Sequence, residues 1–159
     1  MSDIKQSSMK QNFRTSELLR RLFKTPDFAA FLEENKDSVH INSFVEHLER
    51  LCADKNMIRE HVIKRAGIER SFGHQIFRGS RQPSRDNVIR LAFGFSLSVD
   101  ETQELLKIAR KSALYPKIKR DAIILFGLSH KKTMIDMQNI ISENELTLLG
   151  GEKYDYGEL

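Results

Sequence analysis

Positively charged side chains are concentrated in one stretch of the chain, between Met57 and Arg90. This stretch holds eight basic and three acidic residues, a net charge of +5, whereas the whole chain of 159 residues carries a formal net charge of +4. Guanidinium groups donate paired hydrogen bonds to phosphate and carboxylate oxygens. The sequence pI of about 9.2 favours a polyanionic partner, although an amphipathic helix at a membrane surface would also be basic.

The residue patterns of catalysis and metal binding are missing from this sequence. It has no glycine-rich phosphate loop, no HExxH, no G-x-S-x-G and a single cysteine, Cys52. Cys52 lies on a helical apolar stripe, which favours a structural thiol over a reactive one. Five histidines lack metal-ligand spacing: His40, His47, His61, His74 and His130. We therefore predict no enzymatic activity, no cofactor and no metal.

Two short helices, at about 57–65 and 70–78, are expected within the basic stretch, followed by a basic loop. Gly67 supplies the positive φ of a tight turn between them, and Gly79 ends the second helix. Apolar residues fall at the spacing that lets two crossed helices share one core: Val62, Ala66, Ile68 and Ile76. The pattern of this stretch therefore predicts a helix-turn-helix.

Capping signals extend this pair of helices to five. The pairs Ser43/Glu46 and Ser98/Glu101 have the spacing of capping boxes, and each precedes an apolar helical stripe. Between them, another helix starts after residue 84 and is expected to end at Gly94. Because no stretch alternates like a strand, the sequence predicts an all-α fold.

Residues 57–84 resemble the helix-turn-helix of the XRE family, the lambda-repressor-like and Cro-like regulators of bacteria and their phages. The shared features are the glycine turn and the closing run R-G-x-R-x-P-S, which here spans Arg78 to Ser84. The resemblance covers about residues 43–109 without a gap, the five-helix domain of that family. It implies a lambda-repressor-like DNA-binding domain.

This sequence departs from the family pattern at three positions. Arg59 replaces a glutamine that commonly contacts phosphate, Ile63 replaces alanine, and Gly73 replaces an apolar branched residue. The last two family positions face each other where the helices cross, so a larger Ile63 opposite a smaller Gly73 would conserve volume. Our hypothesis is that these two departures compensate each other.

The resemblance also implies roles for individual residues, because the second helix of this motif enters the major groove. Glu69 would either cap that helix or accept from a cytosine amino group, and Phe72 is expected to pack. The residues expected to read bases are Arg70, Ser71, His74 and Gln75. The residues expected to contact phosphate are Arg59, Arg78, Ser80, Arg81 and Arg85.

Helical hairpins are expected on both sides of the basic domain. In the first, Ser16 would cap one helix, and Thr25-Pro26 would cap and start the other. The chain is expected to divide into a disordered tail (1–12), an N-terminal hairpin (13–40), a DNA-binding domain (41–112), a C-terminal hairpin (113–149) and a flexible acidic tail (150–159).

The C-terminal hairpin repeats the two helices before it, at a constant offset of 35 residues and without a gap. The matched pairs include Arg85-Asp86 with Arg120-Asp121, Ser98 with Thr133, Glu101 with Asp136 and Gln103 with Gln138. Any two amphipathic hairpins align to some degree, but here the caps coincide as well as the apolar faces. We expect two stacked copies that bury each other's apolar faces, as in an α-solenoid.

The favoured function is a sequence-specific transcriptional regulator, such as a repressor, that binds double-stranded DNA as a homodimer. Either hairpin is a candidate dimer, effector or protein-partner surface. Two alternatives stay open: an adaptor or inhibitor that binds a protein partner, and a non-specific nucleic-acid binder. Lacking a signal peptide and an apolar run of about 20 residues, the chain is expected to be cytoplasmic and not membrane-inserted.

Overall fold

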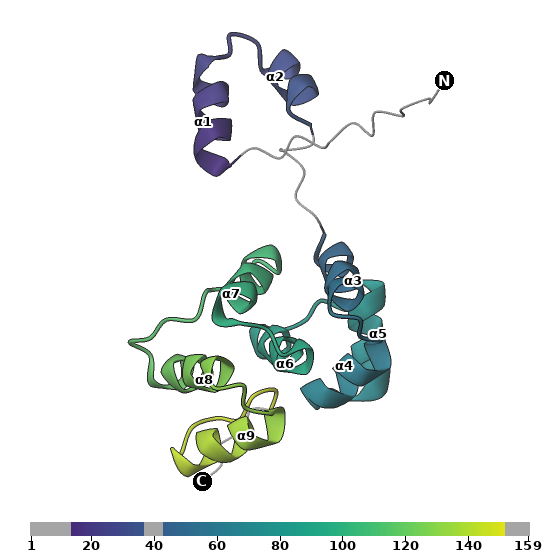
Figure 1. Ribbon diagram of the computed structural model, residues 1–159, viewed down its shortest axis with the longest axis vertical. Coiled ribbons are helices and arrows are strands. Elements are labelled where there is room, and N and C mark those ends of the chain that lie inside the picture. The colour runs from purple at the N-terminus through teal and green to yellow at the C-terminus, as the bar shows by residue number, and fades with distance from the viewer. Residues whose placement is uncertain (1–13, 37–42, 152–159) are drawn as a thin grey trace, which may run out of the picture. The chain divides into compact units, whose positions relative to one another are not determined.

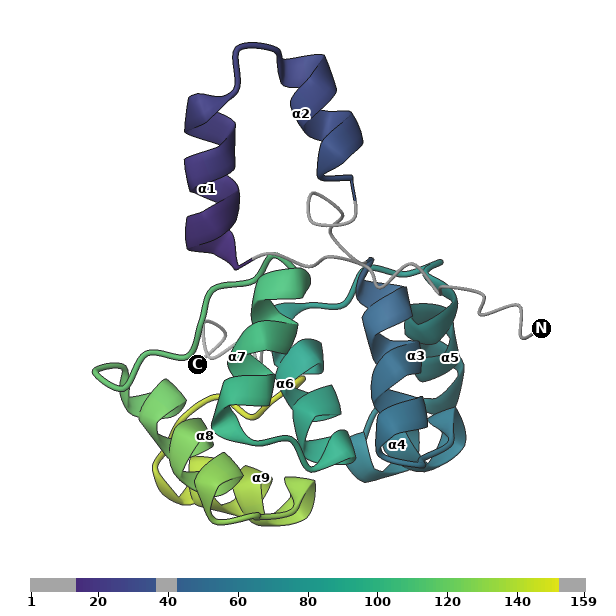
Figure 2. The same cartoon turned by 45° about the horizontal axis from the view of Figure 1, so that its top comes forward.

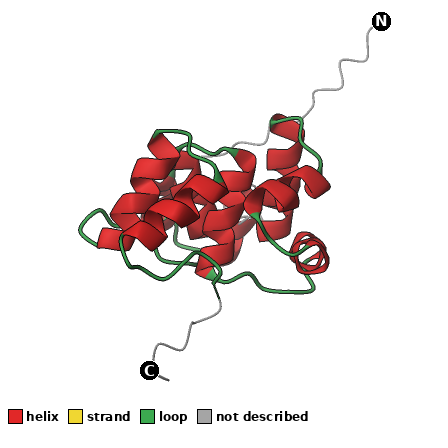
Figure 3. Cartoon of the chain, turned by 90° about the horizontal axis from the view of Figure 1, so that it is seen from below, coloured by secondary structure: helices red, strands yellow, loops and turns green. Residues whose placement is uncertain are grey.

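The computed structural model describes residues 14–36 and 43–151, and all regular secondary structure in these ranges is helical (Figures 1 and 3). The all-α prediction is confirmed for this part of the chain. The expected tail 1–12 lies outside the described residues, as does all but the start of the tail 150–159. The helices are α1 (Thr15–Lys24), α2 (Phe28–Glu34), α3 (Phe44–Asp54), α4 (Arg59–Ala66), α5 (Arg70–Arg78), α6 (Arg85–Phe95), α7 (Val99–Ile108), α8 (Lys119–Ser129) and α9 (Met134–Glu143).

The chain forms two compact units, Met1–Ile41 and Asn42–Leu159. The first contains the hairpin of α1 and α2, in which the Phe28 and Phe31 rings stack. Two of its predicted caps are wrong. Ser16 lies inside α1, which already begins at Thr15, and the cap of α2 is Asp27, whose carboxylate accepts from the Ala29 N–H.

The second unit packs α3 to α9 around one continuous apolar core. The four residues predicted to form the helix-turn-helix core are all buried in it: Val62, Ala66, Ile68 and Ile76. Helix α6 is the central element, since it contacts α4 on one side and α7 and α9 on the other (Figures 1 and 2). The core therefore joins the helix-turn-helix to the C-terminal hairpin.

Gly94 has a different role from the one predicted. It lies inside α6, which continues to Phe95 and ends at Ser96 in the left-handed conformation. A methyl group on Gly94 would lie 2.6 Å from the backbone oxygen of Val62. The glycine therefore allows α6 to approach α4 closely, rather than ending the helix.

The predicted repeat is visible in capping and backbone geometry. Ser98 with Glu101 and Thr133 with Asp136 both form complete capping boxes, at the start of α7 and of α9. Gln103 and Gln138 each bridge to a loop backbone, donating to the carbonyl and accepting from the N–H of Leu114 and of Leu149 respectively. These equivalences extend the repeat through the loops that follow α7 and α9.

The two copies form two reciprocal ion pairs, each of which joins an arginine of one copy to an aspartate of the other. Arg85 of the first copy donates to Asp121 of the second through Nη1 (3.1 Å) and Nη2 (2.9 Å). Arg120 of the second copy donates to Asp86 of the first through Nη1 and Nη2, both at 2.8 Å. Each arginine also donates Nε to a carbonyl of its own copy, Ser112 or Thr147.

Reciprocal exchange identifies the symmetry that relates the copies. If one operation carries the first hairpin onto the second and also the second onto the first, it is a two-fold rotation. A solenoid step carries each repeat onto the next and never returns, so it cannot exchange contacts in this way. The predicted solenoid stacking is therefore wrong, and α6–α7 and α8–α9 form an internal pseudo-two-fold pair.

None of the helices in the described part of the chain combines the length and the apolar character that crossing a bilayer requires.

Candidate nucleic-acid interface

The turn between α4 and α5 fixes how α5 leaves the core. Gly67 has φ 67°, and its N–H donates to the Lys64 carbonyl at 3.0 Å, which ends α4. Helix α5 then begins at Arg70 and ends at Gly79 (φ 79°), as predicted. Its buried residues are Gly73, Ile76 and Phe77, with Phe72 packed against the core beside them, and its exposed residues are Arg70, Ser71 and Arg78.

Helix α5 packs directly against the Ile63 side chain of α4 at Gly73. A methyl group on this glycine would lie 2.5 Å from Cγ2 and 2.8 Å from Cγ1 of Ile63, distances at which atoms overlap. Ile63 is itself buried in the core. The contact between Ile63 and Gly73 expected from the resemblance is therefore present, and the isoleucine occupies the space that a side chain at position 73 would need.

The four residues expected to read bases fall into two groups. Arg70 and His74, one turn apart on α5, both contact Oε1 of Glu60 on α4: Arg70 donates to it through Nη2 at 2.8 Å, and His74 Nε2 lies 3.0 Å from it. Ser71 and Gln75, also one turn apart, have no side-chain hydrogen bond within the described ranges. Only the second group is free of internal partners.

Glu60 is the residue of this interface that the sequence did not reveal. The hydrogen bond from Arg70, and then that from His74, lower its pKa, so the carboxylate stays ionised. No sequence spacing marks it, because it belongs to α4 and meets α5 only through the crossing of the two helices. Its negative charge lies beside residues expected to approach DNA.

Glu69 proves to be the cap of α5. Its Oε1 accepts from the Ser71 N–H (2.9 Å) and its Oε2 accepts from the Phe72 N–H (2.8 Å). These backbone hydrogen bonds lower the pKa of Glu69. Both oxygens therefore serve the helix terminus, and the alternative that Glu69 accepts from a cytosine amino group stays a prediction. Phe72 packs against the core, as expected.

The residues expected to contact phosphate differ in their surroundings. Arg78, Ser80 and Arg81 are exposed around the end of α5 and in the loop after it. Arg59 is half-exposed: its Nη2 donates to Glu49 Oε1 at 3.1 Å, and its guanidinium lies 5.7 Å from the centre of the Phe77 ring. An exposed ion pair of this kind is weak enough to exchange for phosphate.

Arg85 is better explained by the fold than by phosphate binding. Its guanidinium donates to both carboxylate oxygens of Asp121 and to the carbonyls of Ser112 and Ala113. These contacts use all three of its nitrogens in the internal two-fold pair. These contacts favour a structural role for Arg85, and its expected contact with phosphate stays a prediction.

Among the described residues, no group of three or more histidine, cysteine or acidic side chains is arranged to hold a metal ion. Cys52 is partly buried beside the core, and burial raises the pKa of its thiol. Searches of protein-family models, of curated proteins and of solved structures found no significant match to this chain.

Proposed function

We propose that this protein is a sequence-specific DNA-binding regulator that places α5 in the major groove. The observation that carries the proposal is the free outer surface of α5, where Ser71, Gln75 and Arg78 follow one another at helical spacing. Serine and glutamine offer hydrogen bonds to base edges, and an exposed arginine offers charge to phosphate. The turn at Gly67 and the cap at Glu69 define where the helix that carries this surface begins.

The arrangement of α3 to α7 also supports the proposal. These five helices contain the glycine turn and the R-G-x-R-x-P-S run of the XRE family, and they share one core. We propose on this basis that α3–α7 form a lambda-repressor-like domain in a cytoplasmic protein. Helices α8 and α9 then extend that domain.

We propose that the protein binds a two-fold operator as a homodimer through its N-terminal hairpin. Both hairpins expose large apolar side chains, but much of the apolar surface of α8 and α9 is packed in the core of the second unit, whereas Phe31 is the one buried residue of the described part of α1 and α2. Phe23 is 79% exposed and Phe28 is 61% exposed within this hairpin. Burying such residues against a second copy would remove apolar area from water.

The same exposed face supports a second candidate function, that of an adaptor which binds a protein partner through α1 and α2. The ion pairs that Glu60 and Glu49 make with Arg70 and Arg59 also favour this candidate, because they reduce the positive charge available to DNA. In this case the helix-turn-helix would serve only as a scaffold.

Selection from a random duplex library by the full chain tests the proposal. A regulator should enrich one motif, in two half-sites about one helical turn (about 34 Å) apart. Binding to the motif should exceed binding to scrambled DNA at both low and moderate salt. Binding without enrichment, lost as salt rises, would indicate a non-specific nucleic-acid binder, and no binding at all would favour the adaptor.

Substitution of Gln75 should separate base reading from phosphate binding. Gln75→Ala should weaken binding to the selected motif by about tenfold and leave scrambled DNA unchanged, because one bidentate base contact is lost. Arg81→Ala is the matched control, expected to weaken both duplexes about equally. Fluorescence anisotropy with both duplexes measures the effect. Unchanged preference in Gln75→Ala would show that another surface reads the DNA.

Substitution of Glu60 should reveal what its contacts with Arg70 and His74 do. Glu60→Gln removes a negative charge while keeping the shape of the side chain, so affinity for scrambled DNA should rise by about threefold at low salt. Preference for the selected motif should fall, since Arg70 is no longer held in one orientation. Glu104→Gln, at an exposed position on α7, is the control and should change neither quantity.

A further inference from the structure

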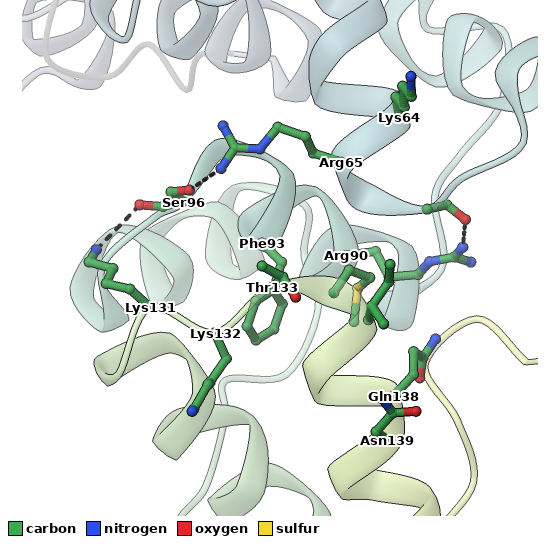
Figure 4. A pocket seen from close by; sticks show the side chains of 13 residues that line it. Lys64, Arg65, Arg90, Phe93, Ser96, Lys131, Lys132, Thr133, Gln138 and Asn139 are labelled. Carbon is green, nitrogen blue, oxygen red and sulfur yellow. Dashed lines mark hydrogen bonds between the residues drawn. The ribbon is translucent and has the colours of Figure 1, made fainter.

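A cavity of about 620 Å³ lies on the second unit, between the C-terminal end of α4, the end of α6 and the start of α9 (Figure 4). None of the residues expected to read bases lines it. Its size falls within the range of small-molecule sites in proteins, about 300–1,000 Å³. The cavity is therefore large enough for a small-molecule ligand.

The charge of the cavity is entirely positive. Five basic side chains line it and no acidic one does: Lys64, Arg65, Arg90, Lys131 and Lys132. Arg65 and Lys131 donate to the hydroxyl and the carbonyl of Ser96 respectively, so their contacts are neutral. Lys64 and Lys132 have no hydrogen bond or ion pair within the described residues, and both are exposed. Lys132 lies near the Asp136 carboxylate, whose pKa is lowered mainly by its hydrogen bonds from Thr133 and to a smaller extent by this lysine.

Arg90 adds a partly buried charge without a counter-ion. Its guanidinium donates to the backbone carbonyls of Ala66 (3.1 Å, from Nε) and Gly67, and it forms no ion pair within the described ranges. Burial lowers its pKa. Asp86 lies near it, but this carboxylate accepts from both Nη atoms of Arg120 and from the Gly150 N–H. The cavity wall thus contains a cation without a direct ion pair, although the nearby Asp86 carboxylate partly offsets the effect of burial on its pKa.

The rest of the lining combines polar side chains with three large apolar ones. Phe93 lies at the centre of the site in Figure 4, and Met134 and Ile135 from the first turn of α9 also line it. Ile135 is 75% exposed, so its side chain is accessible to a ligand in the cavity. The side-chain amide of Gln138 hydrogen-bonds with the Leu149 carbonyl and N–H, so it has few hydrogen bonds left for a ligand.

We propose that this cavity binds a small organic anion with an apolar body. The body rests on Phe93, Met134 and Ile135, and the phosphate or carboxylate group is held by the basic side chains that line the cavity, among them Lys64 and Lys132. This site does not depend on the DNA-binding proposal, because it uses a different set of residues.

Titration of the full chain with 8-anilinonaphthalene-1-sulfonate, a fluorescent aromatic anion, tests the site. The double variant Lys64→Glu/Lys132→Glu should raise the Kd of the probe by about tenfold, and Ile135→Ser by about fivefold. The control Lys107→Glu/Lys117→Glu makes the same charge change at exposed positions outside the cavity and should leave the Kd unchanged. Equal effects of the two double variants would overturn the proposal.

Displacement of the bound probe tests the class of ligand. Naphthyl phosphate should displace it at a concentration about tenfold lower than inorganic phosphate does, because only the former buries an apolar body. Equal potency of the two would refute an amphipathic ligand. Displacement by a short scrambled duplex, at a nucleotide phosphate concentration where inorganic phosphate has no effect, would assign the lysines to nucleic acid instead and also overturn the proposal.

Discussion

Replacement of Asp121 by alanine is expected to lower the free energy of unfolding by about 3 kcal/mol. Asp121 is only 2% exposed, and its carboxylate accepts from Arg85 and from the Tyr115 N–H (3.0 Å). Without it, the Arg85 guanidinium keeps its charge but loses its counter-ion, and the Tyr115 N–H loses its acceptor. The cost should be at the lower end for buried pairs, because a quarter of the Arg85 side chain is exposed.

The internal symmetry supplies a matched control. Asp86→Ala breaks the equivalent pair with Arg120 and the equivalent N–H contact from Gly150, but the Asp86 side chain is 25% exposed. Burial by itself would raise the pKa of Asp86, yet the hydrogen bonds from Arg120 and Gly150 outweigh it and leave the pKa lowered. We expect a loss of about 1.5 kcal/mol. Urea unfolding measures both, and an equal or larger loss in Asp86→Ala would contradict the dependence on burial.

A further variant tests whether the pair stabilises the fold or only avoids an unpaired charge. Arg85→Met/Asp121→Leu removes both charges and keeps apolar volume, so it should cost less than Asp121→Ala alone. A larger cost in the double variant would mean that the hydrogen bonds to the carbonyls of Ser112 and Ala113 dominate.

The sequence predicted the equivalence of the two hairpins but not their symmetry. An ungapped offset of 35 says that Arg85 corresponds to Arg120 and Asp86 to Asp121. It does not say whether each arginine pairs with its own neighbour or with the other copy, because that depends on how the copies rotate about each other. The exchange of partners between copies decides this, and it is a tertiary property.

Local signals predicted some boundaries well and others poorly. Glycine has two physical uses, to adopt positive φ and to permit close approach, and a sequence does not tell them apart. At Gly79 the first use applies and the predicted end of α5 is right, whereas at Gly94 the second applies and α6 continues. Glu60 shows the same limit, because its contact with Arg70 exists only once α4 and α5 have crossed.

The cavity beside Arg90 could not be predicted from the sequence either. Its five basic residues come from three segments, and the acidic residues between them in the chain happen to point elsewhere. Asp86 is the clearest example, since its partner Arg120 holds it outside the cavity lining. The pseudo-two-fold pairing therefore shapes the charge of the cavity as well as stabilising the unit.

Because Ile63 contacts Gly73, the effect of Gly73→Ala on the free energy of unfolding should change sign when Ile63 is replaced by alanine. In the natural chain, Gly73→Ala should lower the free energy of unfolding by about 1 kcal/mol. Overpacking against the β-branched Ile63 side chain destabilises by about 2 kcal/mol, and the higher helix propensity of alanine stabilises by about 1 kcal/mol. In the Ile63→Ala background the obstructing atoms are gone, so Gly73→Ala should stabilise by about 1 kcal/mol. The expected coupling between the two sites is about 2 kcal/mol.

Ile63→Ala alone should lower the free energy of unfolding by about 3–4 kcal/mol, because no side chain on Gly73 can fill the space it leaves. Ser71→Ala is the control for helix propensity, since Ser71 is exposed on the same helix and should have the same effect in both backgrounds. Urea unfolding of the four variants of the cycle gives the coupling directly. If Gly73→Ala has the same effect with and without Ile63, the two departures from the family pattern are independent and the close approach of α5 to α4 has another cause.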